Sequence, residues 1–358
     1  MKNVFVIAEA GVNHNGSEDI ALQLIDVAAE CGADAVKFQT FRSESVISRY
    51  AAKAEYQKST TGQTESQLEM VKRLELSRET HLALLRRCRE RGIEFMSTPF
   101  DSESAEFLVA EMGVDVVKLP SGEITNAPFL LQVSRLGRPV ILSTGMSTLG
   151  EVEMALGVLA YGYLGQTATP SEKLFRDCFS SDAGQAVLSS NVSLLHCTTE
   201  YPAPYEQVNL KVMDTLSVAF QLPVGLSDHT PGIAVAIGAV ARGAKIIEKH
   251  FTLDRTLEGP DHRASLEPAE LAAMVAGIRQ VESAIGSTIK RPSASEWSNR
   301  DVARRSLVAA EDVLEGEPWT SANLTCKRPG TGLSPFLYWS KQETLAGRAY
   351  RVDEPLVE

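Results

Sequence analysis

Short apolar runs alternate with longer amphipathic stretches along most of this 358-residue chain. A short apolar run is typical of a buried strand, whereas apolar residues spaced three and four apart indicate a helix packed on one face. By this criterion the chain contains eight strand–helix units before residue 286. The predicted strands cover 4–8, 35–39, 94–97, 115–119, 139–143, 192–197, 222–226 and 244–249, and the predicted helices cover 17–31, 78–91, 102–112, 127–136, 148–164, 207–219, 232–242 and 267–285.

Repeated strand–helix units predict a parallel sheet, because each helix carries the chain back for a right-handed crossover. Eight units in roughly 285 residues match the count and size of a closed (β/α)8 barrel, the TIM barrel. We prefer this α/β fold to its alternative, an open doubly wound sheet. Two segments, 42–77 and 165–191, are longer than ordinary connections, and we expect them to form lids, binding loops or surface insertions.

The periodic pattern lapses after residue 286. Residues 287–303 are polar and contain Pro292, which is typical of a linker. Residues 304–358 show short apolar runs and turn signals such as the PGTG at 329–332. We therefore expect a catalytic TIM-barrel domain over 1–286, a linker over 287–303 and a small β-rich domain over 304–358. The last domain is too small to be stable unless it docks on another surface.

Composition narrows the possible partners. Hydrophobic residues make up 44% and charged residues 23% of the chain, which is ordinary for a folded domain. The formal net charge of −11 argues against a nucleic-acid partner, although local lysines can still bind a small anion. The segment 1–8 does not have the pattern of a signal peptide, no apolar run approaches the length of a membrane span, and the five cysteines show no C-x-x-C spacing. We expect a cytoplasmic protein with no membrane partner and with mostly buried thiols.

Polar residues collect where the predicted strands end. In a barrel these ends share one rim, and functional side chains gather there. The candidates, in strand order, are Glu9; Lys37 and Gln39; Thr98 and Phe100; Lys118, Ser121 and Glu123; Ser143; Thr199 and Tyr201; His229; and His250.

Two of these side chains, Lys37 and Lys118, each close an apolar run, where a solvated lysine would be out of place. The two lysines supply the positive charge that a phosphate monoester needs. Ser121, Ser143 and the backbone amides at helix starts supply the hydrogen-bond donors. The alternative is that each lysine pairs with a carboxylate in the barrel mouth, either Glu9 or Glu123. The lysines and serines together favour phosphate binding.

The histidines at the last two strand ends, His229 and His250, are candidate metal ligands. A lone histidine after a strand is more often a hydrogen-bonded loop residue, but neighbouring parallel strands would bring both imidazoles to one point. Oxygen-rich surroundings suit Mn²⁺ or Mg²⁺ better than zinc, which histidines alone do not exclude. A phosphate pocket beside an ion that polarises a carbonyl suggests the addition of a phosphorylated enol to an aldehyde.

The segments that carry these residues resemble the sialic acid synthase family. They read IAEAGVNHNGS, VKFQT, STPFD, KLPSGE, ILSTGM, LLHCT followed by EYPAPY, GLSDHT, EKHFTLD, GPDH and KRPGTG, and they span nearly the whole chain. Members of that family condense phosphoenolpyruvate with an N-acetylated mannose-type sugar to give a nonulosonic acid and phosphate. The resemblance implies a TIM barrel followed by a C-terminal domain similar to type III antifreeze proteins (a SAF domain), which reaches into the partner's barrel in a domain-swapped homodimer.

The resemblance also implies a role for each matching residue. The metal, usually Mn²⁺ with Mg²⁺ or Co²⁺ as alternatives, would be held by His229 and His250. The phosphoenolpyruvate would be bound by Lys37, Lys118, Ser121 and Ser143, with Thr98 and Phe100 lining the site. The sugar would be faced by Gln39, Glu123, Tyr201, Asp261 and, from the other subunit, Arg328. Glu9 would manage a proton or water.

One variant bears on the sugar. Synthases for N-acetylneuraminate commonly read CTN at the sixth strand end, whereas this chain has Cys197-Thr198-Thr199 followed by Glu200-Tyr201. This variant and the insertion after residue 165 are similar to bacterial synthases for N,N′-diacetyllegionaminate, whose substrate is 2,4-diacetamido-2,4,6-trideoxymannose. N-acetylneuraminate synthase is the second hypothesis and pseudaminate synthase the third.

The implied mechanism joins C3 of the enol to the sugar aldehyde, adds water at C2 and releases phosphate by C–O cleavage. The lysines and the metal would offset the developing charge. A hypothesis of another class is a carbohydrate- or ice-binding protein with an inert barrel, based on the C-terminal domain alone. The full set of polar strand ends argues against it.

Overall fold

Eight parallel strands form the centre of the first unit in this computed structural model, which describes residues 4–48, 50 and 66–357. The hydrogen-bonded order is β3-β2-β1-β8-β7-β6-β5-β4, and its two end strands, β3 and β4, contact each other. This eight-stranded α/β arrangement confirms the predicted TIM-like fold. The strands are β1 (Phe5–Gly11), β2 (Ala35–Thr40), β3 (Glu94–Pro99), β4 (Val117–Leu119), β5 (Val140–Ser143), β6 (Val192–Cys197), β7 (Val224–Asp228) and β8 (Ile246–His250).

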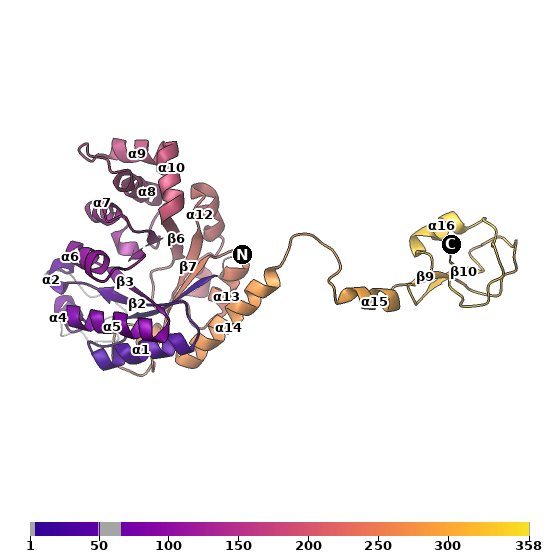
Figure 1. Cartoon of the computed structure of the whole chain (residues 1–358), viewed down its shortest axis with the longest axis horizontal. Coiled ribbons are helices and arrows are strands. Elements are labelled where there is room, and N and C mark those ends of the chain that lie inside the picture. Colours follow the sequence, from indigo (N-terminus) through magenta and orange to yellow (C-terminus); the bar gives the residue numbers. More distant parts are fainter. Residues whose placement is uncertain (1–3, 49, 51–65, 358) are drawn as a thin grey trace. The chain divides into compact units, whose positions relative to one another are not determined.

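Helices follow the strands and cover their outer surface (Figure 1). Several start at a polar cap, such as Ser17, Ser77 and Thr148, whose side-chain oxygens accept a hydrogen bond from the first turn. The elements between the strands are α1 (Glu18–Glu30), α5 (Arg78–Arg91), α6 (Ser102–Glu106), the π-helix η1 (Phe107–Glu111), the 3-10 helix η2 (Ser121–Glu123), α7 (Ala127–Arg135), α8 (Leu149–Tyr163), α11 (Tyr205–Val208), α12 (Val212–Phe220), α13 (Ala234–Ala241), the 3-10 helix η3 (His262–Ala264) and α14 (Pro268–Ile285).

Both long segments predicted as loops contain helices. The segment 165–191 forms α9 (Glu172–Ser180) and α10 (Asp182–Asn191), which pack outside α8 (Figure 1). These helices fit the expected surface insertion, but their helical character was not predicted, although Phe175, Cys178 and Phe179 recur at helical spacing in α9. The described part of 42–77 forms α2 (Ser43–Val46) and α4 (Gln67–Lys72).

The second structural unit, residues 287–358, has a small core of its own. Its only sheet among the described residues pairs β9 (Ser306–Ala309) with β10 (Leu324–Lys327) in antiparallel fashion. The segment predicted as a linker is partly helical, since α15 (Glu296–Ala303) forms with no buried side chain. Two short helices follow β10, η4 (Pro335–Leu337) and α16 (Tyr338–Lys341). Within the described part of the chain, no helix is both long and apolar enough to cross a membrane.

Candidate active site

The side chains that point into the barrel form two layers of opposite character. The lower layer is an apolar plug in which six side chains contact one another: Ile7, Ala35, Met96, Ile141, Leu195 and Ile246. Alternation along a strand brings every second residue to the same face. Two positions further along the same strands, the inward side chains are therefore Glu9, Lys37, Thr98, Ser143, Cys197 and Glu248, and all of them are buried.

A cavity of about 310 Å³ opens above this polar layer. Residues from all eight strand ends line it. It brings together every residue predicted for the site except Glu123 and Arg328: Glu9, Lys37, Gln39, Thr98, Phe100, Lys118, Ser121, Ser143, Thr199, Tyr201, His229, His250 and Asp261.

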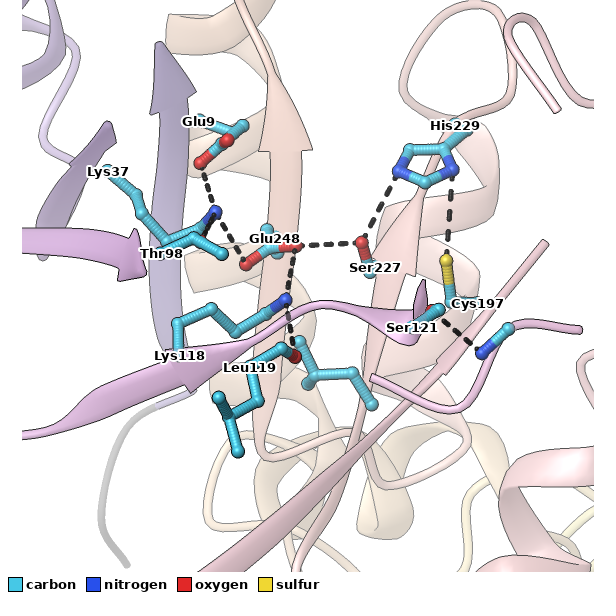
Figure 2. A network of polar contacts seen from close by, with 12 residues as sticks. Glu9, Lys37, Thr98, Lys118, Leu119, Ser121, Cys197, Ser227, His229 and Glu248 are labelled. Atoms are coloured by element: carbon cyan, nitrogen blue, oxygen red, sulfur yellow. Dashed lines mark hydrogen bonds and ion pairs between the residues drawn. The ribbon is translucent and has the colours of Figure 1, made fainter. Parts of the chain in front are cut away.

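The two predicted lysines share a buried carboxylate, as Figure 2 shows. Lys37 Nζ lies 2.5 Å from Glu9 Oε2 and 3.6 Å from Glu248 Oε2, and it donates a hydrogen bond to Thr98 Oγ1 at 2.9 Å. Lys118 Nζ lies 3.6 Å from Glu248 Oε1 and donates to the Leu119 carbonyl at 3.2 Å. The alternative of lysine–carboxylate pairing is thus correct for Glu9, and Glu248 is the main shared partner.

Glu248 was missed in the sequence although a signal for it exists. It lies two positions before His250 on β8, so the alternation of the strand directs both side chains to the same face. Ser227 Oγ donates to Glu248 Oε1 at 2.8 Å from the neighbouring strand β7. A charged residue inside an apolar run, in step with a predicted metal ligand, indicates a site residue rather than a solvated one.

Burial and neighbouring charges give the two carboxylates, Glu9 and Glu248, very different pKa values. Burial, helped by the charge of Glu248, raises the pKa of Glu9 to about 7 against the opposing effect of Lys37. Burial also acts to raise the pKa of Glu248, but the charges of Lys118 and Lys37 outweigh it and lower that pKa to about 2. Below neutral pH the layer therefore carries one ionised carboxylate beneath two lysines, which leaves positive charge available for an anion.

The two predicted metal ligands lie side by side. The ring centroids of His229 and His250 are 5.4 Å apart, and the Tyr201 ring packs on both, at 4.0 Å and 5.5 Å. The Nδ1 atom of His229 lies 2.7 Å from the carbonyl of Thr198, to which it donates, and its Nε2 lies 3.4 Å from Ser227 Oγ. Burial, with the nearby charge of His229, holds the pKa of His250 well below its usual range.

These imidazoles fit a divalent cation. Both are buried, and Nδ1 of His250 has no hydrogen-bond partner among the described residues. In the part of the chain that the structure describes, no group of three or more His, Cys, Asp or Glu side chains is arranged around a common point. Two neutral ring nitrogens would thus be the protein's ligands, and the remaining positions would fall to water or substrate oxygens.

The serines predicted for phosphate binding line the same cavity as the lysines. Ser143 Oγ is buried without a hydrogen-bond partner among the described residues. Ser121 Oγ accepts a hydrogen bond from the Gly145 amide at 2.9 Å. A Cβ atom at Gly145 would come within 2.3 Å of Thr199 Oγ1 and 2.8 Å of Ser121 Oγ, so only glycine fits between these strand ends.

Glu123 and Arg328 lie outside the cavity lining. The carboxylate of Glu123, in the 3-10 helix η2, accepts a hydrogen bond from Asn126 Nδ2 at 2.6 Å, and its role toward the sugar stays a prediction. Arg328 follows β10 in the second unit and is exposed. The buried Asp261 does line the cavity, and burial raises its pKa to about 6.

One side of the cavity is apolar, which the sequence did not predict. Six side chains form a separate cluster there: Val12, Phe41, Val46, Val71, Leu74 and Phe100. We call this cluster the apolar wall. It combines the residues that follow β1, β2 and β3 with side chains of α2, α4 and the turn after α4.

Comparisons with known proteins agree with this geometry. Residues 24–290 match the model of the NeuB family. The chain is 48% identical to the N,N′-diacetyllegionaminic acid synthase of Campylobacter jejuni over all of both chains. It is 46% identical to the enzyme of the same name from Legionella pneumophila, over 92% of this chain and 87% of that protein.

A solved structure shares the fold. The N-acetylneuraminic acid synthetase of Leptospira borgpetersenii, determined in complex with citrate, superposes with a TM-score of 0.66 at 34% identity. The match covers 83% of this chain and 90% of that one.

Proposed function

The chain belongs to the NeuB family, and we propose that it condenses phosphoenolpyruvate with 2,4-diacetamido-2,4,6-trideoxymannose and water to give N,N′-diacetyllegionaminate and phosphate. It is a transferase of the nonulosonic acid synthase family. The observation that carries the proposal is the polar layer, where two buried lysines share Glu248 beneath the His229 and His250 imidazoles in one cavity. The identity to two legionaminic acid synthases, over nearly the whole chain, supports this choice of sugar.

The polar layer suits an enol phosphate. Lys37 and Lys118 supply positive charge, and Ser143 supplies a hydroxyl that lacks a partner within the described structure. Inside a buried cavity such donors act far more strongly than in water, and they need no rearrangement during reaction. Phosphate bound here would displace part of the lysine–carboxylate contact.

The proposed reaction has two bond-forming steps. The C2–C3 π electrons of phosphoenolpyruvate bond from C3 to C1 of the open-chain sugar, and the aldehyde oxygen gains a proton. Water then adds at C2, and the C2–O bond to phosphate breaks as the C2 carbonyl forms. The two protons that water loses balance those gained by the sugar oxygen and the departing phosphate. Glu9, with its pKa raised to about 7, is the group that would accept a proton from water.

His229 and His250 would hold a divalent metal ion, for which we propose Mn²⁺, with Mg²⁺ or Co²⁺ as alternatives. When bound, such an ion supplies Lewis-acid polarisation of a carbonyl oxygen. The Tyr201 ring and the hydrogen bond from His229 to Thr198 would fix the orientation of the first imidazole.

A phosphate-release assay tests the proposal. The purified protein is given phosphoenolpyruvate with the diacetamido sugar, with N-acetylmannosamine or with no sugar, before and after EDTA treatment. We expect release with the diacetamido sugar, loss of release with EDTA and recovery with Mn²⁺. Turnover with N-acetylmannosamine but not with the diacetamido sugar would overturn the choice of substrate, and EDTA-insensitive release would overturn the metal.

We also propose that residues 304–358 form an antifreeze-like domain that supplies Arg328 to the site of a partner chain. Arg328 is exposed and lies in the KRPGTG segment that carries the resemblance. Proteins with Arg328→Ala and with His229→Ala, each inactive alone, should recover partial activity when mixed under conditions of subunit exchange. No recovery despite proven exchange would contradict the swapped homodimer.

A cytoplasmic location is the last part of the proposal. All five cysteines are free thiols, and three of them, Cys88, Cys178 and Cys197, are buried. A chain with this many unpaired thiols suits a reducing compartment. Fractionation of cells that make the protein would test it.

A further inference from the structure

The apolar wall forms a second chemical surface in the same cavity as the polar layer. Val12 and Phe41 are at most 8% exposed, and Leu74 is 9% exposed. Gln67 of α4 lines the same cavity but does not belong to the cluster. The cavity therefore offers a substrate one charged end and one hydrocarbon side.

Local contacts fix the wall in position. The carboxylate of Glu75 accepts hydrogen bonds from the backbone amide and the hydroxyl of Ser43, which ties the turn after α4 to the start of α2. A capping box of Ser66 and Glu69 starts α4, the helix that carries Val71. The Phe41 and Phe100 rings meet edge to face at 6.2 Å. These contacts hold the side chains of the apolar wall in fixed positions.

The wall discriminates between the parts of the two substrates. The phosphate and carboxylate of phosphoenolpyruvate would lose their hydration without any partner against valine and leucine side chains, so they belong to the polar layer. The sugar must then contact the wall. Any sugar hydroxyl facing it would be buried without a hydrogen-bond partner, whereas a methyl group would gain contact.

We propose that the apolar wall determines sugar specificity by receiving the methyl groups of a doubly acetamidated 6-deoxyhexose. These are the C6 methyl and the methyl of the C4 acetamido group, neither of which N-acetylmannosamine has. The inference rests on the proposed function and adds the surface that selects the substrate. Discrimination by one such group is worth roughly 10- to 200-fold in kcat/KM.

Three valine-to-threonine changes test the inference, because threonine has nearly the shape of valine and adds only a hydroxyl. In the protein with Val12→Thr, Val46→Thr and Val71→Thr, we expect the ratio of kcat/KM for the diacetamido sugar over N-acetylmannosamine to fall roughly tenfold. The KM for phosphoenolpyruvate should change less than about twofold, since that substrate lies on the polar layer. Val235→Thr is the matched control, because Val235 is half-buried on α13 and outside the cavity.

The outcomes distinguish a failure of the proposed function from a failure of the inference about the apolar wall. If the wild type turns over neither sugar, the proposed function fails. If the wild type prefers the diacetamido sugar and the ratio is the same in the triple variant and the control, the wall does not select the sugar and only this inference fails. Should the triple variant unfold, Val71→Thr alone decides, since Val71 is only half-buried. That variant should lower the ratio about threefold, and an unchanged ratio overturns the inference.

Discussion

Two buried groups of lysine and carboxylate lie on opposite faces of the same strands, and they differ in how well their polar atoms are satisfied. On the outer face, Lys249 Nζ donates to Asp228 Oδ2 at 2.9 Å, and Asp228 Oδ1 accepts from the amide and hydroxyl of Thr230. Both side chains are at most 1% exposed, and the two residues are partners in the β7–β8 register. Every charge on this face has a close partner.

On the inner face, fewer polar atoms have a close partner. Lys118 comes no closer than 3.6 Å to a carboxylate oxygen, and Ser143 Oγ and His250 Nδ1 have no hydrogen-bond partner among the described residues. A satisfied buried pair specifies structure, whereas buried polar atoms left without partners cost free energy unless something binds them. The difference supports the inner face as the proposed site, and the outer pair joins β7 to β8 next to His229 and His250.

The largest effect is expected on the outer face. Lys249→Met leaves the Asp228 carboxylate buried without its cation, which should lower the free energy of unfolding by about 3–5 kcal/mol. Urea unfolding measures this loss. The double variant Asp228→Asn with Lys249→Met, which removes both charges and keeps an acceptor for Thr230, should regain most of it. A loss below about 1 kcal/mol for Lys249→Met would show that the pair is not a support.

Lys118→Met tests the inner face. Its removal leaves Glu248 with Lys37 as a partner, so stability should change by less than about 1 kcal/mol. The phosphate loses one buried cation, and kcat/KM for phosphoenolpyruvate should fall about 10²- to 10³-fold. Steady-state kinetics and urea unfolding on the same preparation separate the two quantities. Normal activity in a destabilised protein would mean that Lys118 supports the structure and does not bind the substrate.

The pH dependence of turnover sharpens the role of the inner face. A carboxylate that accepts a proton from water must be ionised, and the pKa of Glu9 in the ligand-free protein is raised to about 7, so kcat/KM should increase with pH through that value. The increase between pH 6 and 8 should be about tenfold. Glu9→Gln should lower kcat and abolish this acidic limb, and a limb that persists in the variant would assign it to another group.

The smallest effect is expected at Thr199. This side chain lines the cavity beside Gly145 and Ser121 and does not belong to the apolar wall. Thr199→Asn should therefore shift the preference between the two sugars only about threefold, toward N-acetylmannosamine. A shift larger than that of the valine-to-threonine variants would move sugar selection from the wall to the sixth strand end.

Strand ends were the most predictable part of this chain, because period-two alternation and apolar runs depend on local sequence. Lys37 and Lys118 stood out for the same reason, as charges inside such runs. The wall was not predictable in this way. Val46 and Val71 lie in short helices within a polar segment, and their common surface depends on the tertiary packing of α2 against α4. The capping box at Ser66 was the only local signal we identify for α4.

Glu123 shows the opposite failure. Its position after a strand end suggested the cavity, but a single 3-10 turn directs its carboxylate to Asn126. Sequence position gives the strand from which a side chain comes and not the rotation of the turn that carries it. Glu248 was predictable from the alternation of β8, because it lies two positions before His250 and its side chain is on the same face.

The fate of the bridging oxygen of phosphoenolpyruvate is the most direct measurement of the chemistry assigned to the polar layer. The enzyme is incubated with the diacetamido sugar and phosphoenolpyruvate labelled with ¹⁸O between C2 and phosphorus, and both products are analysed by mass spectrometry. C–O cleavage predicts that the label leaves in inorganic phosphate and that the nonulosonic acid carries none. Label retained in the sugar product, or no condensation product at all, would contradict the account.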